Sequence, residues 1–189
     1  MEALTRESII KKIERGESLS GVNLSQADLS YSNLKKGDFQ GADLSGAHLQ
    51  NANLEGANLK EANLENAFLF GSNLKDTNLE GAKLTGANLQ DTNMEGASLK
   101  GTNLNRQSLF GAQLDSANLE GAILTRAKLK RASFIGANLK GADLSGAHLQ
   151  RAALKRADLS GANLSGANLV NADLTDARVD GANFEGAIQ

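Results

Sequence analysis

The chain has 189 residues, a formal net charge of −2 and no Cys, Pro or Trp. Without Cys it can form neither a disulfide framework nor a thiolate metal site, and its near-balanced charge gives no overall attraction to nucleic acid or to an anionic membrane. No apolar run approaches the roughly 18 residues of a membrane span, and the first residues lack the apolar segment of a secretory signal. We therefore expect a cytoplasmic protein that spans no membrane and does not bind nucleic acid directly.

The first predicted element is a helix over residues 5–15. Thr5 can cap its first turn, Ile9, Ile10 and Ile13 form one apolar side, and Gly16 is placed to end it. We expect this helix to cover the end of the element that follows. The chain is accordingly divided into an N-terminal helical cap, residues 1–17, and a repeat region, residues 18–189.

The repeat region has a period of five residues, unbroken from residue 19 to residue 184. Of its 34 central positions, 29 are Leu and the other five are Phe, Met or Val; a small residue, usually Ala, stands two positions earlier, with Asn or Asp between them. A helix would rotate successive Leu residues by about 140° and spread them over every face. A flat strand would point them to alternate faces. Short extended segments that end in corners place every Leu and Ala inward, which predicts a solenoid.

The glycines indicate how many corners close one coil. Eighteen of the 20 Gly residues lie two positions after the central Leu, where a residue without Cβ turns most freely. Sorted by a period of 20, one class of corners contains Gly at every position except Glu61, whereas a period of 15 scatters the glycines. One coil therefore has 20 residues and four sides. Asn or Asp residues 20 apart are expected to form side-chain ladders, and the alternating charges Lys35, Glu55 and Lys75 to support the register.

The unit Ala-(Asn/Asp)-Leu-X-X resembles the pentapeptide-repeat family over about residues 18–188. This resemblance implies an all-β fold, a right-handed quadrilateral β-helix of about eight coils with a short N-terminal capping α-helix. The absence of interrupting loops resembles the long members that are abundant in cyanobacteria. One position departs from the pattern, because Gln107 stands where the repeat requires a small inward residue. We predict a local distortion or a re-aimed side chain around Asn105–Ser108.

Catalytic chemistry finds little support in the sequence. His48 and His148 occupy the same outward position five coils apart, about 24 Å at the usual strand spacing. They can share neither a metal ion nor a proton, and the convex surface of a rod provides no cleft that excludes water. We predict no catalytic residue, no metal ligand, no cofactor and no small-molecule substrate, and therefore no enzyme.

One side of the predicted rod carries outward aromatic residues and overlaps a basic segment. Residues 126–156 contain eight basic residues and one acidic residue, whereas the rest of the chain is acidic. Clustered apolar groups and one-signed charge are typical of docking surfaces. The alternative stays open that strands simply tolerate the aromatics and that water solvates the charges. The candidate interaction surface comprises Phe68, Phe70, Phe110, Arg126, Lys128, Lys130, Arg131 and Arg151.

Two functions follow from these features. The first is a non-catalytic protein–protein interaction or scaffold module, a rigid rod that presents a surface to an unidentified protein partner. The second, implied by the family resemblance, is a DNA-mimicking inhibitor or protector of a type II topoisomerase. The basic segment and the net charge of −2 favour the first, because a DNA mimic needs an acidic surface. The last coil has no predicted cap, so it either stays open or is covered by a second copy in a homodimer.

Overall fold

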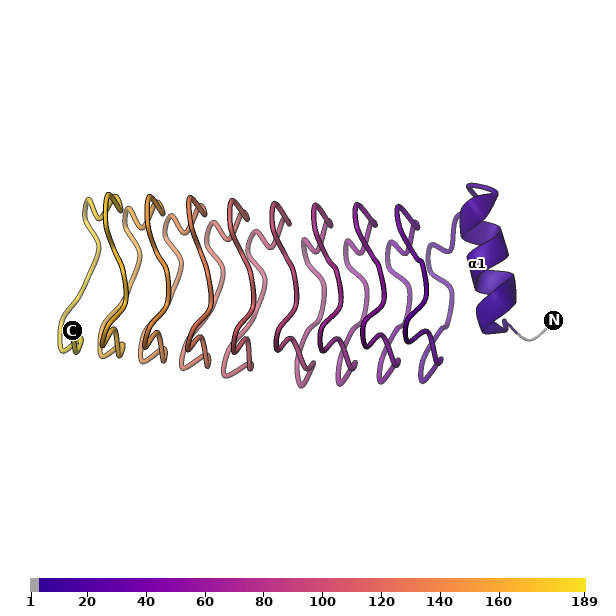
Figure 1. Cartoon of the computed structure of the whole chain (residues 1–189), viewed down its shortest axis with the longest axis horizontal. Coiled ribbons are helices and arrows are strands. Elements are labelled where there is room, and N and C mark those ends of the chain that lie inside the picture. Colours follow the sequence, from indigo (N-terminus) through magenta and orange to yellow (C-terminus); the bar gives the residue numbers. More distant parts are fainter. Residues whose placement is uncertain (1–3) are drawn as a thin grey trace.

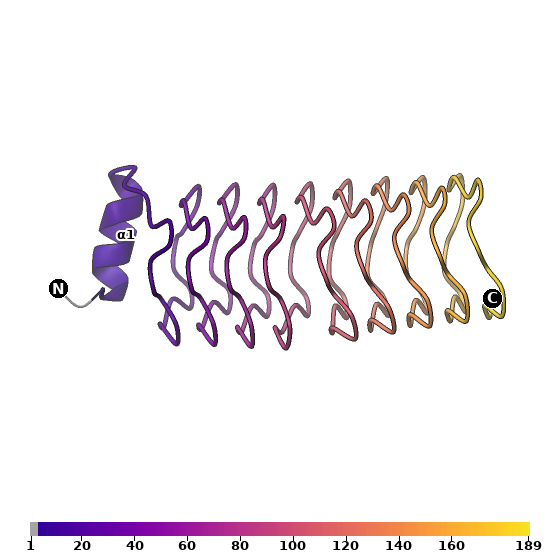
Figure 2. The ribbon, with the colours of Figure 1, turned by 180° about the vertical axis from the view of Figure 1, so that it is seen from behind.

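A computed structural model describes residues 4–189 and shows one helix followed by a straight stack of coils (Figure 1). Helix α1 spans Arg6–Glu14. Thr5 caps it, its Oγ1 accepting a hydrogen bond of 3.2 Å from the Ser8 N–H. Ile9 is fully buried and Ile13 packs beside it against the core, so α1 covers the first coil at one end of the rod (Figures 1 and 2). The predicted capping helix is confirmed. Residues 1–3 of the predicted cap lie outside the described residues.

The rod is built from short parallel bridges between residues 20 apart. Asn33 pairs with Asn53, and Asn53 pairs with Asn73. The N–H of a central residue typically donates to a carbonyl 19 residues further on, as Leu34 does to Asn53 at 2.7 Å. Each side of a coil is too short to form a longer strand before the next corner turns the chain. The 20-residue, four-sided coil predicted from the glycine positions is therefore correct.

Every one of the 34 corners has a positive φ at the position two residues after the central residue. Gly occupies 18 of these positions, with φ near that of Gly21 at 65°, and 16 carry another residue, such as Glu61 at 58°. The N–H of the following residue usually closes the turn by donating to the central carbonyl, as Ala62 does to Leu59 at 3.0 Å. This geometry is that of type II turns, in which a residue other than Gly costs on the order of 1 kcal/mol.

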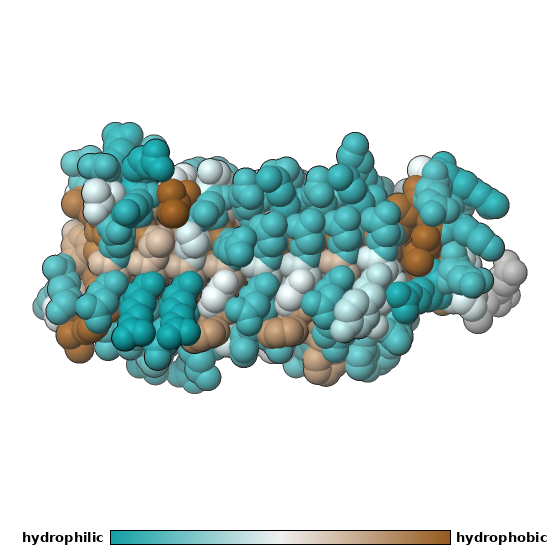
Figure 3. Space-filling view, viewed as in Figure 1, coloured by the Kyte–Doolittle hydropathy of each residue, from teal (hydrophilic) through white to brown (hydrophobic). Residues whose placement is uncertain are grey.

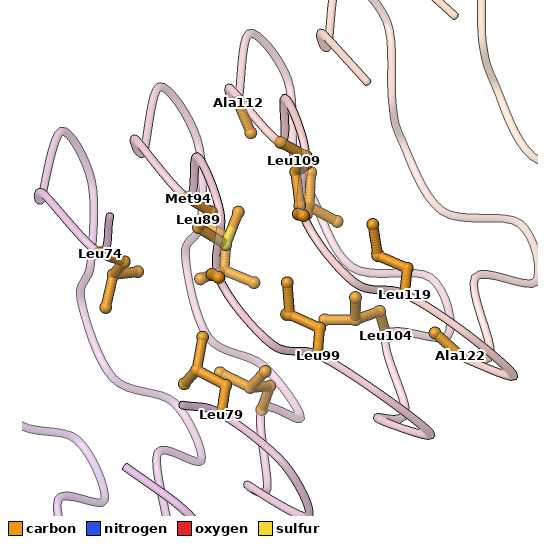
Figure 4. Packing of buried hydrophobic residues seen from close by; sticks show 14 of the residues in the cluster. Leu74, Leu79, Leu89, Met94, Leu99, Leu104, Leu109, Ala112, Leu119 and Ala122 are labelled. Carbon is orange, nitrogen blue, oxygen red and sulfur yellow. The ribbon is translucent and has the colours of Figure 1, made fainter. Parts of the chain in front are cut away.

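The core is a column of central residues lined by the small residues that precede them. Leu residues of successive coils stack on one another in Figure 4, and Leu99 and Leu119 are both fully buried. Where Ser or Thr replaces Ala at residues 72, 77, 92 and 102, the hydroxyl donates to a carbonyl three residues earlier, as Thr77 does to Leu74 at 2.6 Å. The inward positions predicted from the repeat are the buried ones.

Outward side chains join the coils through ladders and ion pairs. Asn73 Nδ2 donates to Asn53 Oδ1 at 3.1 Å, while Asn73 Oδ1 accepts from the Lys75 N–H at 3.2 Å. Ion pairs between adjacent coils connect Lys35 with Glu55 at 2.8 Å and Lys75 with Glu95 at 3.0 Å. Both patterns match the role in register predicted for the Asn ladders and the alternating charges.

The stack is interrupted at one edge, here called the seam, between residues 81–89 and residues 100–108. The N–H groups of Gly81, Leu84, Gly86 and Leu89 have no hydrogen-bond partner within residues 4–189, although the equivalent groups of other stacked coils do. Bridge pairing persists between residues 88 and 108 but is absent between residues 83 and 103 of the described chain. Figures 1 and 2 show the wider spacing as a step along the lower edge of the rod.

The seam confirms the local distortion predicted at Gln107, and it reaches beyond the predicted residues. Gln107 is 8% exposed and lines an opening of about 350 Å³ together with Thr85, Asn103 and Arg106. Within the described residues, the fully buried side-chain polar atoms without a hydrogen-bond partner belong to Ser32 and Gln50. The Gln107 amide is not one of them. The amide therefore keeps access to solvent through the opening. The missing bridge, between residues 83 and 103, lies one repeat earlier than predicted, because the coils part on the side next to the oversized residue.

Candidate interaction surface

Phe110 and two lysines line a shallow hollow on the side of the rod that carries Leu109 and Leu129. The hollow has a volume of about 400 Å³. Phe110 is half-buried, whereas Lys128 and Lys130 are exposed. Its complete lining is Gln90, Ser108, Phe110, Lys128, Lys130, His148 and Gln150. The repeat places these residues together because positions 20 apart are direct neighbours on adjacent coils.

Two arginines extend this basic area at the adjoining corner. The Arg131 guanidinium lies 5.9 Å from the centroid of the Phe110 ring, within the range of a cation–π contact. Arg151 occupies the same corner position one coil further on, and both residues have a positive φ. Phe110, Lys128, Lys130, Arg131 and Arg151 form one continuous area, here called the Phe110 surface.

Several cations on other sides of the rod are paired with acidic residues, whereas those of the Phe110 surface are not. Lys100 pairs with Glu120 at 3.2 Å and Lys155 pairs with Asp173 at 3.2 Å. None of the four cations of the Phe110 surface forms an ion pair within residues 4–189. Their charge is therefore available to an acidic group from another molecule.

Phe68 and Phe70 do not join the Phe110 surface. Each is 43% exposed, and both lie two coils away on the same side. Phe68 packs against His48, with ring centroids 4.8 Å apart and a tilt of 34°. The face in Figure 3 is mostly hydrophilic, with hydrophobic residues in separate patches. The two phenylalanines are thus a second, smaller patch rather than part of one aromatic cluster.

Arg126 lies around the corner from Lys128, beside a residue that the sequence reasoning missed. It lines a hollow of about 450 Å³ together with Arg106. Arg106 precedes the basic segment at residues 126–156, so charge counted along the chain does not group it with Arg126. The period of 20 was the available signal, since it makes residues 106 and 126 direct neighbours.

The two histidines lie in one column of bridges, five coils apart, as the sequence predicts. Within residues 4–189 no group of three or more His, Cys, Asp or Glu side chains is placed to hold a metal ion. In the same residues no helix has the length and hydropathy to cross a membrane.

A family model described as pentapeptide repeats matches eight copies in the chain, over residues 18–46, 38–76, 72–106, 112–151 and 152–188. The chain belongs to the pentapeptide-repeat family. The model leaves residues 107–111 unmatched, a stretch that begins with Gln107. The fold is accordingly the right-handed quadrilateral β-helix that was expected.

Two pentapeptide-repeat structures illustrate the relationship. HetL, a protein involved in heterocyst differentiation regulation from the cyanobacterium Nostoc sp. strain PCC 7120, is 31% identical; the match covers 98% of this chain and 94% of HetL, with a TM-score of 0.49. QnrB1, a plasmid-mediated fluoroquinolone resistance protein, is 25% identical, with coverage of 92% and 87% and a TM-score of 0.81. No protein in the curated comparison matches the chain.

Proposed function

We propose that this pentapeptide-repeat protein is a non-catalytic interaction module that binds an acidic protein partner on the Phe110 surface. The observation that supports this best is the set of four unpaired cations around one half-buried aromatic ring. Arg and aromatic residues are enriched at the energetic centres of protein interfaces, and unpaired charge accelerates the approach of an opposite surface. The ion pairs on neighbouring sides join adjacent coils, whereas the cations of the Phe110 surface make no such contribution to the fold.

The shape of the molecule supports a binding role over catalysis. The hollows on the rod are shallow and open, so they would not exclude water from a reacting group. The two histidines are five coils apart and cannot act on one substrate atom. We therefore propose that the protein presents side chains on a rigid support and transforms no substrate.

The similarity to QnrB1 favours a second candidate, the protection or inhibition of a type II topoisomerase by DNA mimicry. DNA mimicry requires negative charge along the rod, and the basic segment at residues 126–156 opposes it. A supercoiling assay with a bacterial topoisomerase separates the two candidates. Inhibition or drug protection at stoichiometric protein would favour the second; unchanged supercoiling favours the first.

The test of the proposed docking surface is a triple charge reversal, Lys128→Glu, Lys130→Glu and Arg131→Glu. The wild-type protein isolates partners from host extract, and the recovered partner is then measured against both proteins by surface plasmon resonance. We expect the triple variant to fold normally, because all three side chains are exposed. Its association rate should fall, and the salt dependence of that rate should disappear.

A matched control places the same three reversals elsewhere. Lys11, Lys36 and Lys60 form no ion pair within residues 4–189, and their reversal changes the net charge by the same amount. This control should bind like the wild type. If both triple variants bind the partner equally well, or lose it equally, the Phe110 surface is not the docking site.

We also propose that two copies pair through the C-terminal coil. Val179 is 43% exposed and Ile188 is 56% exposed there, so a second coil would remove apolar surface from water. Sedimentation velocity measures the oligomeric state directly. A concentration-dependent dimer that Val179→Lys abolishes would support the pairing, and a monomer at all concentrations would contradict it.

A further inference from the structure

Two arginines are stacked at one corner of the rod without any counter-charge. Arg106 and Arg126 occupy the same corner position on adjacent coils, about 4.8 Å apart at the usual strand spacing. Neither forms an ion pair within residues 4–189. Like charges on directly neighbouring strands are destabilising. The fold gains nothing from this arrangement, which distinguishes it from the alternating columns of Lys and Glu.

The backbone at these two positions adds to the cost. Arg106 has φ 58° and Arg126 has φ 54°, in the left-handed region that glycine adopts most easily. The next two corners of the same column are Gly146 and Gly166, so glycine is available to this chain at the same place. Two glycines would therefore adopt the turn conformation at a lower conformational cost than these two arginines.

Hydroxyl groups complete the surroundings of the two guanidinium groups. The hollow of about 450 Å³ beside them is lined by Asn105, Arg106, Thr125, Arg126, Ser145, Gly146 and Ser165. The Ser160 and Thr175 hydroxyls elsewhere donate to a carboxylate two residues earlier, both at 2.6 Å. The hydroxyls of Thr125, Ser145 and Ser165 make no hydrogen bond within residues 4–189.

The carboxylate nearest in sequence does not neutralise the hollow. Asp143 Oδ1 already accepts from the Ser145 N–H at 3.0 Å and from Asn163 Nδ2 at 3.2 Å, and Asp143 is not part of the lining. Gly146 leaves room for the Arg126 side chain, because a Cβ at residue 146 would lie 3.2 Å from Arg126 Cγ. Two forked cations and three free donors thus share one open hollow without an acidic residue.

We propose that this corner is a binding site for a phosphate monoester. Guanidinium groups bind phosphate oxygens with two parallel, charge-assisted hydrogen bonds, and hydroxyl groups can donate to the remaining oxygens. A bound phosphate offsets the repulsion between Arg106 and Arg126. The site is independent of the Phe110 surface, since neither Arg106 nor Arg126 lines the hollow of Phe110.

The test is a titration of the full ¹⁵N-labelled chain with phosphoserine, monitored by NMR at constant ionic strength. We expect saturable shifts of the Thr125, Arg126 and Ser145 amides. The double variant Arg106→Gln with Arg126→Gln should bind at least about tenfold more weakly, because it loses charge-assisted hydrogen bonds. Arg156→Gln is the matched control, since Arg156 is another corner arginine, with φ 58°, outside this hollow. It should leave the affinity unchanged.

A second arm distinguishes a free phosphate from one carried by a protein. A neutral peptide with one phosphoserine is compared with inorganic phosphate and with the unphosphorylated peptide. Tighter binding of the phosphopeptide assigns the site to a phosphorylated protein segment, and equal affinity assigns it to small phosphate esters. Shifts that never saturate, or that are equally large at Arg156, would overturn the proposal. The Phe110 surface is intact in the double variant, so this result stands apart from the docking test.

Discussion

Gln107 occupies the inward position that Ala87 fills one coil earlier, and the hydrogen bonds between the two coils are missing on that side. The N–H of Ser108 forms no hydrogen bond of normal geometry with the Ala87 carbonyl, whereas the N–H of Lys128 donates to the Gln107 carbonyl at 2.8 Å. The coil after Gln107 is therefore regular and the coil before it is displaced. An amide side chain in a space shaped for a methyl group accounts for this asymmetry.

Replacing Gln107 by Ala should close the seam and stabilise the protein by about 1–3 kcal/mol, because the oversized side chain no longer holds the coils apart and their backbone hydrogen bonds can form. Urea denaturation measures the gain. Hydrogen exchange checks its origin, since the amides of Gly81, Leu84 and Gly86 should become protected as their partners approach. The outward Gln113→Ala is the control and should change neither quantity. A loss of stability in Gln107→Ala would show that the seam has another cause.

Much of the fold could be predicted because every repeat places the same residue types in equivalent positions of the coil. The buried Leu column, the corners and the 20-residue coil all follow from spacing alone. The position of the seam was predicted only in part. The sequence pattern identifies the oversized Gln107, but it does not show how the neighbouring backbone relaxes around it. The loss of the bridge between Lys83 and Asn103 depends on which side of a closed coil separates first.

The candidate surface was predicted less completely. The period of 20 correctly put Phe110, Lys128 and Lys130 on one side, since register determines which outward residues are neighbours. It could not separate Phe68 from them, because side-chain rotamers decide that this ring packs on His48. Arg106 is not part of the predicted surface, because it is remote from the basic segment along the chain and becomes a neighbour of Arg126 only across the coils.

Leu129→Ala should destabilise the rod by roughly 2–5 kcal/mol, because the stacked coils cannot collapse into the space it leaves. Leu129 is fully buried. The outward Lys100→Ala should cost well under about 1 kcal/mol, since the Lys100–Glu120 ion pair is exposed. Denaturant melts compare the two. Equal losses would contradict the assignment of inward and outward positions.

Acid should weaken the rod in a narrow range of pH. Hydrogen bonds from the Ser45 and Ser30 hydroxyls hold the pKa values of Asp43 and Asp28 below their ordinary value of 3.8. Because folding lowers these pKa values, their stabilising contribution is complete above the unfolded value and is lost as the pH falls through the folded values. The urea midpoint should therefore stay level down to about pH 5 and fall below about pH 4.

Asp43→Asn with Asp28→Asn should reduce this acid sensitivity, because Asn keeps the acceptor oxygen but does not titrate. Asp91→Asn is the control, since the Asp91 carboxylate accepts no hydrogen bond within residues 4–189. The midpoint of each variant is measured from pH 7 to pH 3. A double variant as acid-sensitive as the wild type would mean that other carboxylates control the transition.

Phe110→Ala should weaken binding of the partner mainly by accelerating its dissociation. The half-buried ring is the apolar centre of the proposed docking surface, and loss of such an anchor commonly costs about 2 kcal/mol or more, roughly a thirtyfold change in affinity. Charge reversal at Lys128 and Lys130 should instead slow association, so the two kinds of variant differ in kinetics. Phe70→Ala is the control, because Phe70 lies in the same column two coils away and outside the hollow. Surface plasmon resonance of folded variants measures both rates. If Phe70→Ala and Phe110→Ala increased the dissociation rate equally, the partner would span the whole side and the Phe110 surface would be only one part of a longer interface.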